Sequence, residues 1–162
     1  MTSNFRDVVY FNKSFGVPVN TTIQKDIFKT DPKLVKLRLD LILEEVKELQ
    51  EAVTNHDMTE TIDALADILY VVYGAGASFG INLDQAFKIV HDSNMSKLCQ
   101  SEDDAISTVA LYEEKYKAGA SPYDSPAYRL SDNGKDWVVY NKSTGKILKN
   151  YKYTPANFEE ME

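Results

Sequence analysis

The chain has 162 residues, of which 43% are hydrophobic, and it carries a net charge of −7 with a pI near 4.9. This acidic balance argues against nucleic acid as a partner because phosphate backbones are bound by basic faces. It does not argue against a nucleotide, since bound cations can reverse the local charge. The single cysteine, Cys99, excludes an internal disulfide framework, and Met1–Asp7 lacks the pattern of a signal peptide, so we expect a cytoplasmic protein.

The first predicted helix lies near the N-terminus, where one helical face is formed by Phe5, Val8, Asn12 and Phe15. Gly16 and Pro18 follow and end that helix. Residues 19–31 then predict a loop or a short helical turn. Asp31 is the expected N-cap of the next helix, with Pro32 at its first position.

The helix that begins at Pro32 carries acids beside a packing seam. Its apolar stripe alternates steps of four and three residues and consists of Val35, Leu39, Ile42, Val46, Leu49 and Val53. Glu44, Glu45 and Glu48 border this stripe and do not occupy the opposite, solvated face. Taken alone, these acids would also fit a solvated face with Lys47 as their partner.

A second acidic helix is predicted over Glu60–Tyr73. At about 100° per residue, one narrow face of it holds Glu60, Asp63, Asp67, Tyr70 and Gly74. Nearly every other direction is apolar, and no Lys or Arg occurs between Thr61 and Ile81, so we expect this helix to be buried. Because an isolated buried charge costs several kcal/mol, to order of magnitude, the acids should share a divalent cation. Ligands that are all oxygens favour Mg²⁺, with Mn²⁺ as an alternative, over zinc.

The polar connection between the two acidic helices is short, covering residues 54–58. Such a connection makes the helices antiparallel neighbours, which brings the two sets of acids toward each other. The apolar run Ala64–Leu83 also has a membrane-like composition. Asp67 inside it and Asp63 before it favour a protein interior, so we expect no membrane partner.

The remaining chain predicts two further helices and a hairpin. Asn82 is the expected cap of a helix that leads into His91–Lys97. Ser101–Lys117 has the spacing of another helix. A β-hairpin is predicted where Trp137–Tyr140 and Lys146–Lys149 flank a polar turn.

These elements predict an all-α protein, a bundle of four or five helices with a small C-terminal β-hairpin. We expect one domain over residues 1–162, with a helical core at about 5–117, loop and hairpin at about 118–150 and a polar tail at 151–162. The second acidic helix has more apolar surface than one small bundle can cover. We therefore expect a homodimer or a dimer of dimers.

Several motifs occur in an order that resembles a known superfamily. The acidic motif Glu44-Glu45-x-x-Glu48 is followed by Glu60-x-x-Asp63 and Asp67. Asp63–Gly74, His91-x-x-Asn94-Met95-Ser96-Lys97 and Thr144–Lys149 look like a helix signature and two later motifs. Together they resemble the all-α nucleoside triphosphate pyrophosphohydrolases, the MazG-like superfamily, in its phosphoribosyl-ATP pyrophosphohydrolase-like branch.

The resemblance implies Mg²⁺-dependent hydrolysis of a nucleoside triphosphate, with a dNTP expected, to nucleoside monophosphate and pyrophosphate. Such an enzyme would clean the nucleotide pool. The implied metal ligands are Glu45, Glu48, Glu60, Asp63 and Asp67. The implied catalytic residues are Glu44, Glu45 and Glu48, with Glu44 as a ligand or as the residue that orients the attacking water.

Five further residues are implied in substrate binding: Asn94, Lys97, Lys146, Lys149 and Arg38. Asn94 and Lys97 would contact the phosphates or the sugar, and the two hairpin lysines would close over the phosphates. Arg38, two turns before the acids, would pair with them or touch phosphate.

The chain departs from the superfamily pattern in two places. The segment Ser101–Trp137 is longer than in compact members, and its role is unassigned. Ala64 stands where many MazG-like members have Glu, so Asp63 or Glu60 would have to supply that ligand.

Three alternatives remain open from the sequence. The same chemistry could act on phosphoribosyl-ATP in histidine synthesis. The fold could instead serve as a non-catalytic helical dimerisation module. A di-iron bundle is disfavoured because such sites use Glu-x-x-His, and neither His56 nor His91 has a Glu three residues before it.

Overall fold

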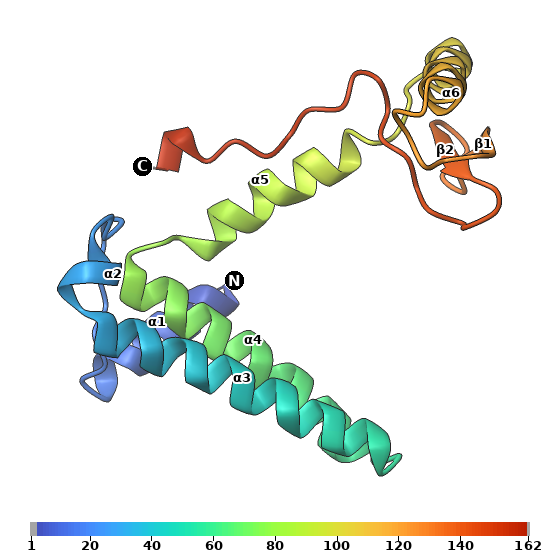
Figure 1. The fold of residues 1–162 in the computed structure, drawn as a ribbon. Coiled ribbons are helices and arrows are strands. Elements are labelled where there is room, and N and C mark those ends of the chain that lie inside the picture. Colours follow the sequence, from blue (N-terminus) through green and yellow to red (C-terminus); the bar gives the residue numbers. More distant parts are fainter. Residues whose placement is uncertain (1–2, 162) are drawn as a thin grey trace. The chain divides into compact units, whose positions relative to one another are not determined.

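The computed structural model describes residues 3–161, which are mostly helical with one small antiparallel sheet (Figure 1). In chain order the elements are α1 (Asn4–Ser14), α2 (Ile27–Thr30), α3 (Pro32–Thr54), α4 (Met58–Phe79), α5 (Leu83–Met95), α6 (Glu102–Lys117), β1 (Pro126–Leu130), β2 (Trp137–Asn141) and the 3-10 helix η1 (Glu159–Met161). The predicted helical class with a small C-terminal hairpin is confirmed. The described residues contain six α-helices, whereas four or five were predicted. The additional helix, α2, is a single turn within residues predicted as a loop or short helical turn.

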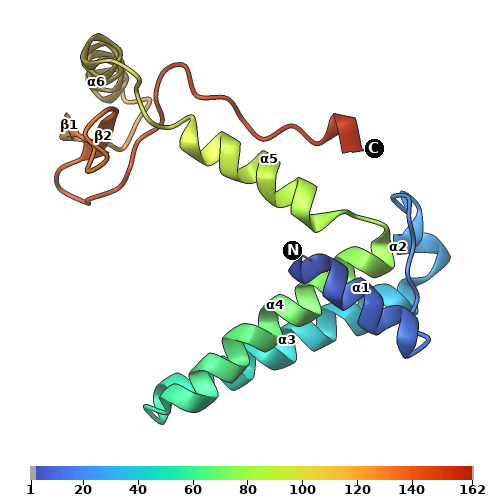
Figure 2. The same ribbon diagram turned by 180° about the vertical axis from the view of Figure 1, so that it is seen from behind.

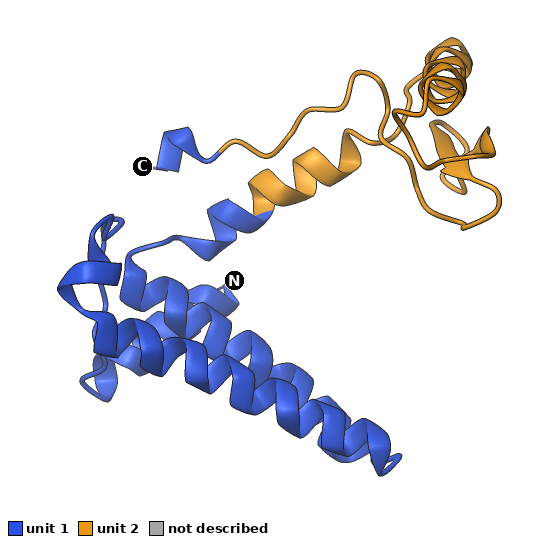
Figure 3. Ribbon diagram, in the orientation of Figure 1, with its two compact units in different colours: residues 1–87, 158–162 blue, residues 88–157 orange. Residues whose placement is uncertain are grey.

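The described chain forms two compact units, which Figure 3 colours separately. The helical unit comprises residues 3–87 and 158–161, and the C-terminal unit comprises residues 88–157. The boundary falls within α5. The prediction of one domain over residues 1–162 is not tested by this division and stays a prediction.

In the helical unit, α3 and α4 run antiparallel side by side, and α1 lies against α4 (Figures 1 and 2). The Asp31 side chain accepts a hydrogen bond from the backbone N–H of Leu34 at 3.0 Å, so it caps α3 as predicted. Asp57 caps α4 in the same way by accepting from the N–H of Glu60 at 3.1 Å. These caps begin each helix at a fixed residue and so set the register of the acids.

Gly80 ends α4 in a left-handed conformation, with φ of 76°. A Cβ atom at this position would lie 1.9 Å from the carbonyl oxygen of Thr22. The loop before α2 therefore packs directly on the backbone at the end of α4, and only glycine fits there.

Burial along α4 differs between its two halves. Residues Gly74–Ser78 are all buried, while Ile62, Leu65 and Leu69 are 50–63% exposed. The prediction that the whole helix is buried is therefore wrong for its first half within the described chain. By length and composition α4 could cross a membrane, but core helices of soluble proteins pass the same test.

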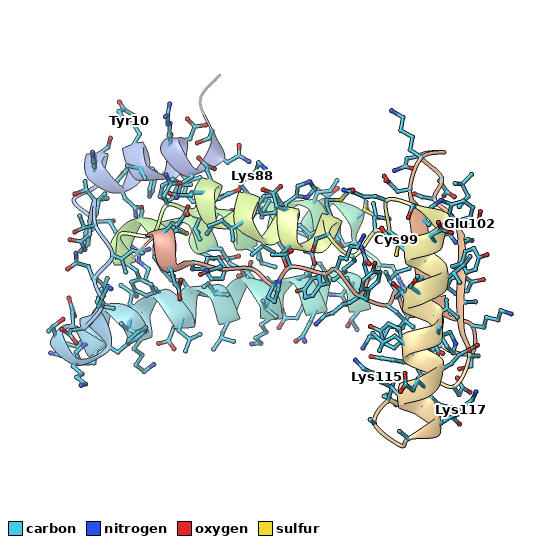
Figure 4. All side chains as sticks on the ribbon, turned by 90° about the horizontal axis from the view of Figure 1, so that it is seen from above. Tyr10, Lys88, Cys99, Glu102, Lys115 and Lys117 are labelled. Carbon is cyan, nitrogen blue, oxygen red and sulfur yellow. The ribbon has the colours of Figure 1, made fainter. Side chains whose placement is uncertain are left out.

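The C-terminal unit has a small core of its own, formed by Cys99, Ala105, Val139 and Leu148. Figure 4 shows Cys99 beside α6, with Glu102 at the start of that helix and Lys115 and Lys117 at its end. Cys99 also forms an antiparallel bridge with Trp137, the first residue of β2. The segment after α5 is thereby held between α6 and the hairpin.

The hairpin differs from the prediction in one strand. The regular ladder joins β2 to β1, with Leu130 opposite Trp137, whereas Lys146–Lys149 meets β2 only through a single bridge at Tyr140 and Ile147. Residues 131–136 join β1 to β2, and hydrogen bonds close this loop from the Ser131 N–H to the Asp136 carbonyl at 2.7 Å and from the Gly134 N–H to the Ser131 carbonyl at 2.9 Å. The closed loop brings β1 beside β2.

Candidate active site

A line of shielded side chains along α3 includes one of the predicted acids. Arg38 and Ala52 are 7% and 5% exposed, and the partly buried Glu45 lies midway between them at seven-residue intervals. Seven residues are about two helical turns, so the three side chains share one line of α3. Glu45 is thus an acid on the face where α3 packs.

Glu45 is the most perturbed acid of the cluster. Its Oε2 atom is shielded from solvent and has no hydrogen-bond partner. Burial raises the pKa of Glu45, and the nearby charges of Glu48, Asp67, Glu44 and Asp63 raise it further. The acids of both helices are therefore close enough to affect one another's ionisation, as the antiparallel arrangement predicted.

A cavity of about 350 Å³ opens between the ends of α3 and α4 near their connection. Three of the predicted ligands line it, namely Glu48, Glu60 and Asp63. Glu51 and Asp57 line it as well and were missed as site residues. Both acids are visible in the sequence, but each also has a structural role. Glu51 pairs with Lys47 one turn earlier, and Asp57 caps α4.

Exposure separates the six predicted acids. Glu45 and Asp67 are partly buried, whereas Glu44, Glu48, Glu60 and Asp63 are exposed. The expectation that Asp63 sits on a buried helix is therefore wrong for the described chain. Its face of α4 opens on the cavity, so its carboxylate keeps access to solvent.

The acids lack neutralising partners. Within residues 3–161 none of the six forms a salt bridge, and Lys47 pairs instead with Glu51 at 3.6 Å. In the same described range, no three His, Cys, Asp or Glu side chains are gathered as a preformed metal cage. A shielded carboxylate oxygen without a donor, beside four further acids, is a donor set that suits a hard divalent cation.

Arg38 lies apart from any acid partner. No hydrogen bond or salt bridge of its guanidinium occurs in the described chain, its Nε is shielded without a partner, and burial lowers its pKa. A Cβ at Gly74 would lie 3.3 Å from its Nη1, so the absence of a side chain on α4 makes room for the guanidinium. Asn12 on α1 is buried there too, with an unpaired Nδ2.

The other four predicted substrate residues lie in the C-terminal unit. Lys97 donates from Nζ to Oδ1 of Asn94 at 2.9 Å. Lys97, Lys146 and Lys149 line one cavity of about 300 Å³ together with Tyr112 and Tyr123. The two tyrosines were not predicted as site residues, because their spacing on the sequence shows nothing of this contact.

Residues 5–94 match the family model described as phosphoribosyl-ATP pyrophosphohydrolase. The chain belongs to this family. A relative, "Uncharacterized protein L479" of Acanthamoeba polyphaga mimivirus, is 32% identical, and the match covers 98% of this chain and 95% of that protein. The similarity to that relative therefore extends beyond the family model into the C-terminal unit.

Membership in the phosphoribosyl-ATP pyrophosphohydrolase family confirms the predicted superfamily and its branch. It indicates a hydrolase with a pyrophosphohydrolase-type activity. All six acids, Arg38 and Asn94 lie inside the matched residues 5–94, whereas Lys97, Lys146 and Lys149 lie outside them. The acid cluster thus belongs to the family domain, and all residues that line the lysine cavity lie beyond it.

Proposed function

We propose that this pyrophosphohydrolase family member hydrolyses a nucleoside triphosphate, with a dNTP as the expected substrate, to nucleoside monophosphate and pyrophosphate. The observation that carries this proposal is the shielded, unpartnered Oε2 of Glu45 among acids that no base neutralises. A phosphate chain is itself an anion, so it can approach such a cluster only with cations between them. The acids therefore support a Mg²⁺-dependent reaction on a phosphate substrate.

The proposed ligands of Mg²⁺, or of Mn²⁺, are Glu45, Glu48, Glu60, Asp63 and Asp67. When bound, the metal would supply Lewis-acid polarisation of phosphoryl oxygens and a lowered pKa for water. Exposed Glu44, beside Glu45, would hold the attacking water and accept its proton. The water oxygen forms a new bond to phosphorus, and the bond to the leaving pyrophosphate breaks.

Arg38, Asn94, Lys97, Lys146 and Lys149 are proposed to contact substrate. All carry donors that suit phosphate or sugar oxygens. Arg38 offers the strongest case among them, because its buried guanidinium has no acceptor within the described chain.

We also propose self-association as a homodimer or dimer of dimers. The exposed apolar side chains on α3 and α4 form a large unpartnered surface, which includes Leu39, Leu43, Val53, Ile62, Leu65 and Leu69. Exposed apolar surface of this extent is typical of an interface between subunits. Light scattering tests this: a strictly monomeric protein would contradict it.

A nucleotide panel with Mg²⁺ tests the activity, with nucleoside monophosphate and pyrophosphate identified as products. Glu48→Gln and Asp67→Asn should abolish product formation while the fold is retained. Asp40→Asn is the matched control, because Asp40 lies on the same helix and pairs with Lys36 on the exposed surface. Absence of pyrophosphate release from every compound in the panel would contradict the proposal.

Phosphoribosyl-ATP is the second candidate substrate, favoured by the description of the family model. It belongs in the same panel, and preferential turnover of it would replace the dNTP proposal. If the protein hydrolyses no compound in the panel and Mg²⁺ does not change its melting temperature, the results would instead support a helical dimerisation module.

A further inference from the structure

A cavity of about 300 Å³ in the C-terminal unit gathers positive charge within an acidic protein. Its side chains include Lys97, Lys146, Lys149, Tyr112 and Tyr123, and no carboxylate lines it. In the described part of the chain none of the three lysines forms a salt bridge. In a chain with a net charge of −7, the unusual feature of this site is that three lysines line one cavity without an acid.

Each lysine is held by a neutral group. Nζ of Lys146 lies 5.3 Å from the ring centre of Tyr123, and Nζ of Lys149 lies 4.6 Å from that of Tyr153. Lys97 donates to the Asn94 amide oxygen. Only Tyr123 among these partners lines the cavity, but none of the three neutralises its lysine. The positive charge of all three lysines therefore remains beside the cavity.

One wall of the cavity comes from the segment Ser101–Trp137, whose role the sequence left unassigned. Tyr112 lies on α6 and Tyr123 on the loop that follows, and their ring centres are 5.8 Å apart at an angle of 70°. The Tyr112 hydroxyl donates to the backbone carbonyl of Lys149 and accepts from its N–H, both at 3.1 Å. The segment therefore supplies one wall of the cavity, and through Tyr112 it also holds the backbone of Lys149 in the opposite wall.

We propose that residues 88–157 carry a metal-independent binding site for a phosphorylated anion with at least two negative charges, and that Tyr112 and Tyr123 form its aromatic wall. The positive charge of the three lysines matches such an anion, and the aromatic side chains can contact an attached base or sugar. The choice of a phosphorylated ligand rests on the proposed function. Its two sources there are the released pyrophosphate and a nucleotide.

Calorimetric titration of the full chain with inorganic pyrophosphate tests the proposal, in buffer freed of divalent metal by a chelating resin. Without metal the acid cluster repels pyrophosphate, so a signal reports the lysine cavity. We expect saturable binding to the wild-type chain. The affinity should fall about tenfold in each of the single variants Lys146→Gln and Lys149→Gln, because each loses a charged hydrogen bond. Lys142→Gln is the matched control, because it removes the same charge from an exposed lysine outside the cavity.

Several results separate this proposal from the proposed hydrolysis. No binding to the wild-type chain, or equal weakening by Lys142→Gln and Lys146→Gln, would overturn it even if nucleotides are hydrolysed. Selective weakening in Lys146→Gln, with unchanged binding in Glu48→Gln, would support it even if no nucleotide is hydrolysed. Thermal melts by circular dichroism check that each variant is folded.

The source of the ligand is read from a second titration with a deoxynucleoside monophosphate. Tighter binding of the monophosphate than of pyrophosphate would support a nucleotide that stacks on Tyr123. That preference should then fall in Tyr123→Leu and persist in Tyr123→Phe. The reverse order of affinities would support pyrophosphate as the ligand.

Discussion

The two units of this protein place unneutralised charge of opposite sign in two separate cavities. The α3–α4 cavity of the helical unit has acids without bases, and the Lys146 cavity of the C-terminal unit has lysines without acids. Elsewhere on the described surface several opposite charges pair, as Lys88 does with Asp92 and Lys152 with Asp104. Charges of one sign that gather around a cavity without a counter-charge are the feature that both candidate sites share.

The comparison also shows how differently the two sites are built. The acids come from two helices that the sequence joins by a short connection, so their meeting follows from local rules. The lysine cavity joins Lys97, after α5, to residues beyond β2 and to tyrosines on and after α6. It exists only through contacts between distant segments.

The largest expected effect is the loss of activity when the acidic cavity loses its metal. Chelation of Mg²⁺, or Glu48→Gln, should lower turnover at least about a thousandfold, because several kcal/mol of transition-state stabilisation are removed. Measurement of pyrophosphate release checks this. Lys146→Gln should lower turnover less, and if it abolished turnover while Glu48→Gln did not, the proposed roles of the two cavities would be wrong.

Helical periodicity and capping predicted the helices and the acid face. The cap at Asp31 was predicted from its neighbours in the chain, and the cap at Asp57 and the stop at Gly80, which the structure shows, depend on neighbouring residues in the same way. The exposure of Ile62 and Leu65 could not be predicted in this way. An apolar face looks the same in sequence whether it packs on its own chain or awaits a partner.

The C-terminal unit was the less predictable region for a physical reason. Strand β1 was missed because Lys146–Lys149 offered a competing partner for β2, and both segments do contact it. The loop that closes β1 onto β2 is held by backbone hydrogen bonds of Ser131 and Gly134, which a pattern of strand residues does not show. The wall formed by Tyr112 and Tyr123 depends on how α6 packs, which no local pattern specifies.

The second prediction compares the backbone of the two units. Gly80→Ala should destabilise the helical unit by several kcal/mol, because left-handed strain of about 1–2 kcal/mol adds to a clash with the Thr22 carbonyl. Gly145→Ala is the matched control, since Gly145 has φ of 70° but open space around it, and it should cost only the strain. Urea unfolding curves measure both. Equal losses of unfolding free energy in the two variants would show that the loop at Thr22 moves and relieves the clash.

The third prediction concerns the buried cation of the helical unit. Arg38→Met should raise the free energy of unfolding by about 1 kcal/mol or more, because it replaces a buried, unpartnered charge with an apolar side chain of similar length. The same variant should lose substrate affinity if Arg38 contacts phosphate. Lys36→Met, on the exposed face of the same helix, should change neither property. A destabilised Arg38→Met would mean that the guanidinium has a partner in the native protein.

The smallest expected effect is the pH dependence caused by Glu45. Its pKa is raised above 4.5 in the folded chain by burial and by the neighbouring acids. Below pH 4.5 the carboxyl is protonated in both states and costs nothing; as the pH rises from 4.5 through the raised pKa, the unfolded state gains the advantage of ionisation. Without metal, Glu45→Gln should therefore melt a few degrees higher than the wild type near pH 7 and at the same temperature near pH 4. Added Mg²⁺ should reverse the order near pH 7, because a bound cation stabilises the ionised wild-type carboxylate and Gln offers only a neutral oxygen. An equal melting difference at both pH values would show that the carboxylate's charge is not what destabilises this site.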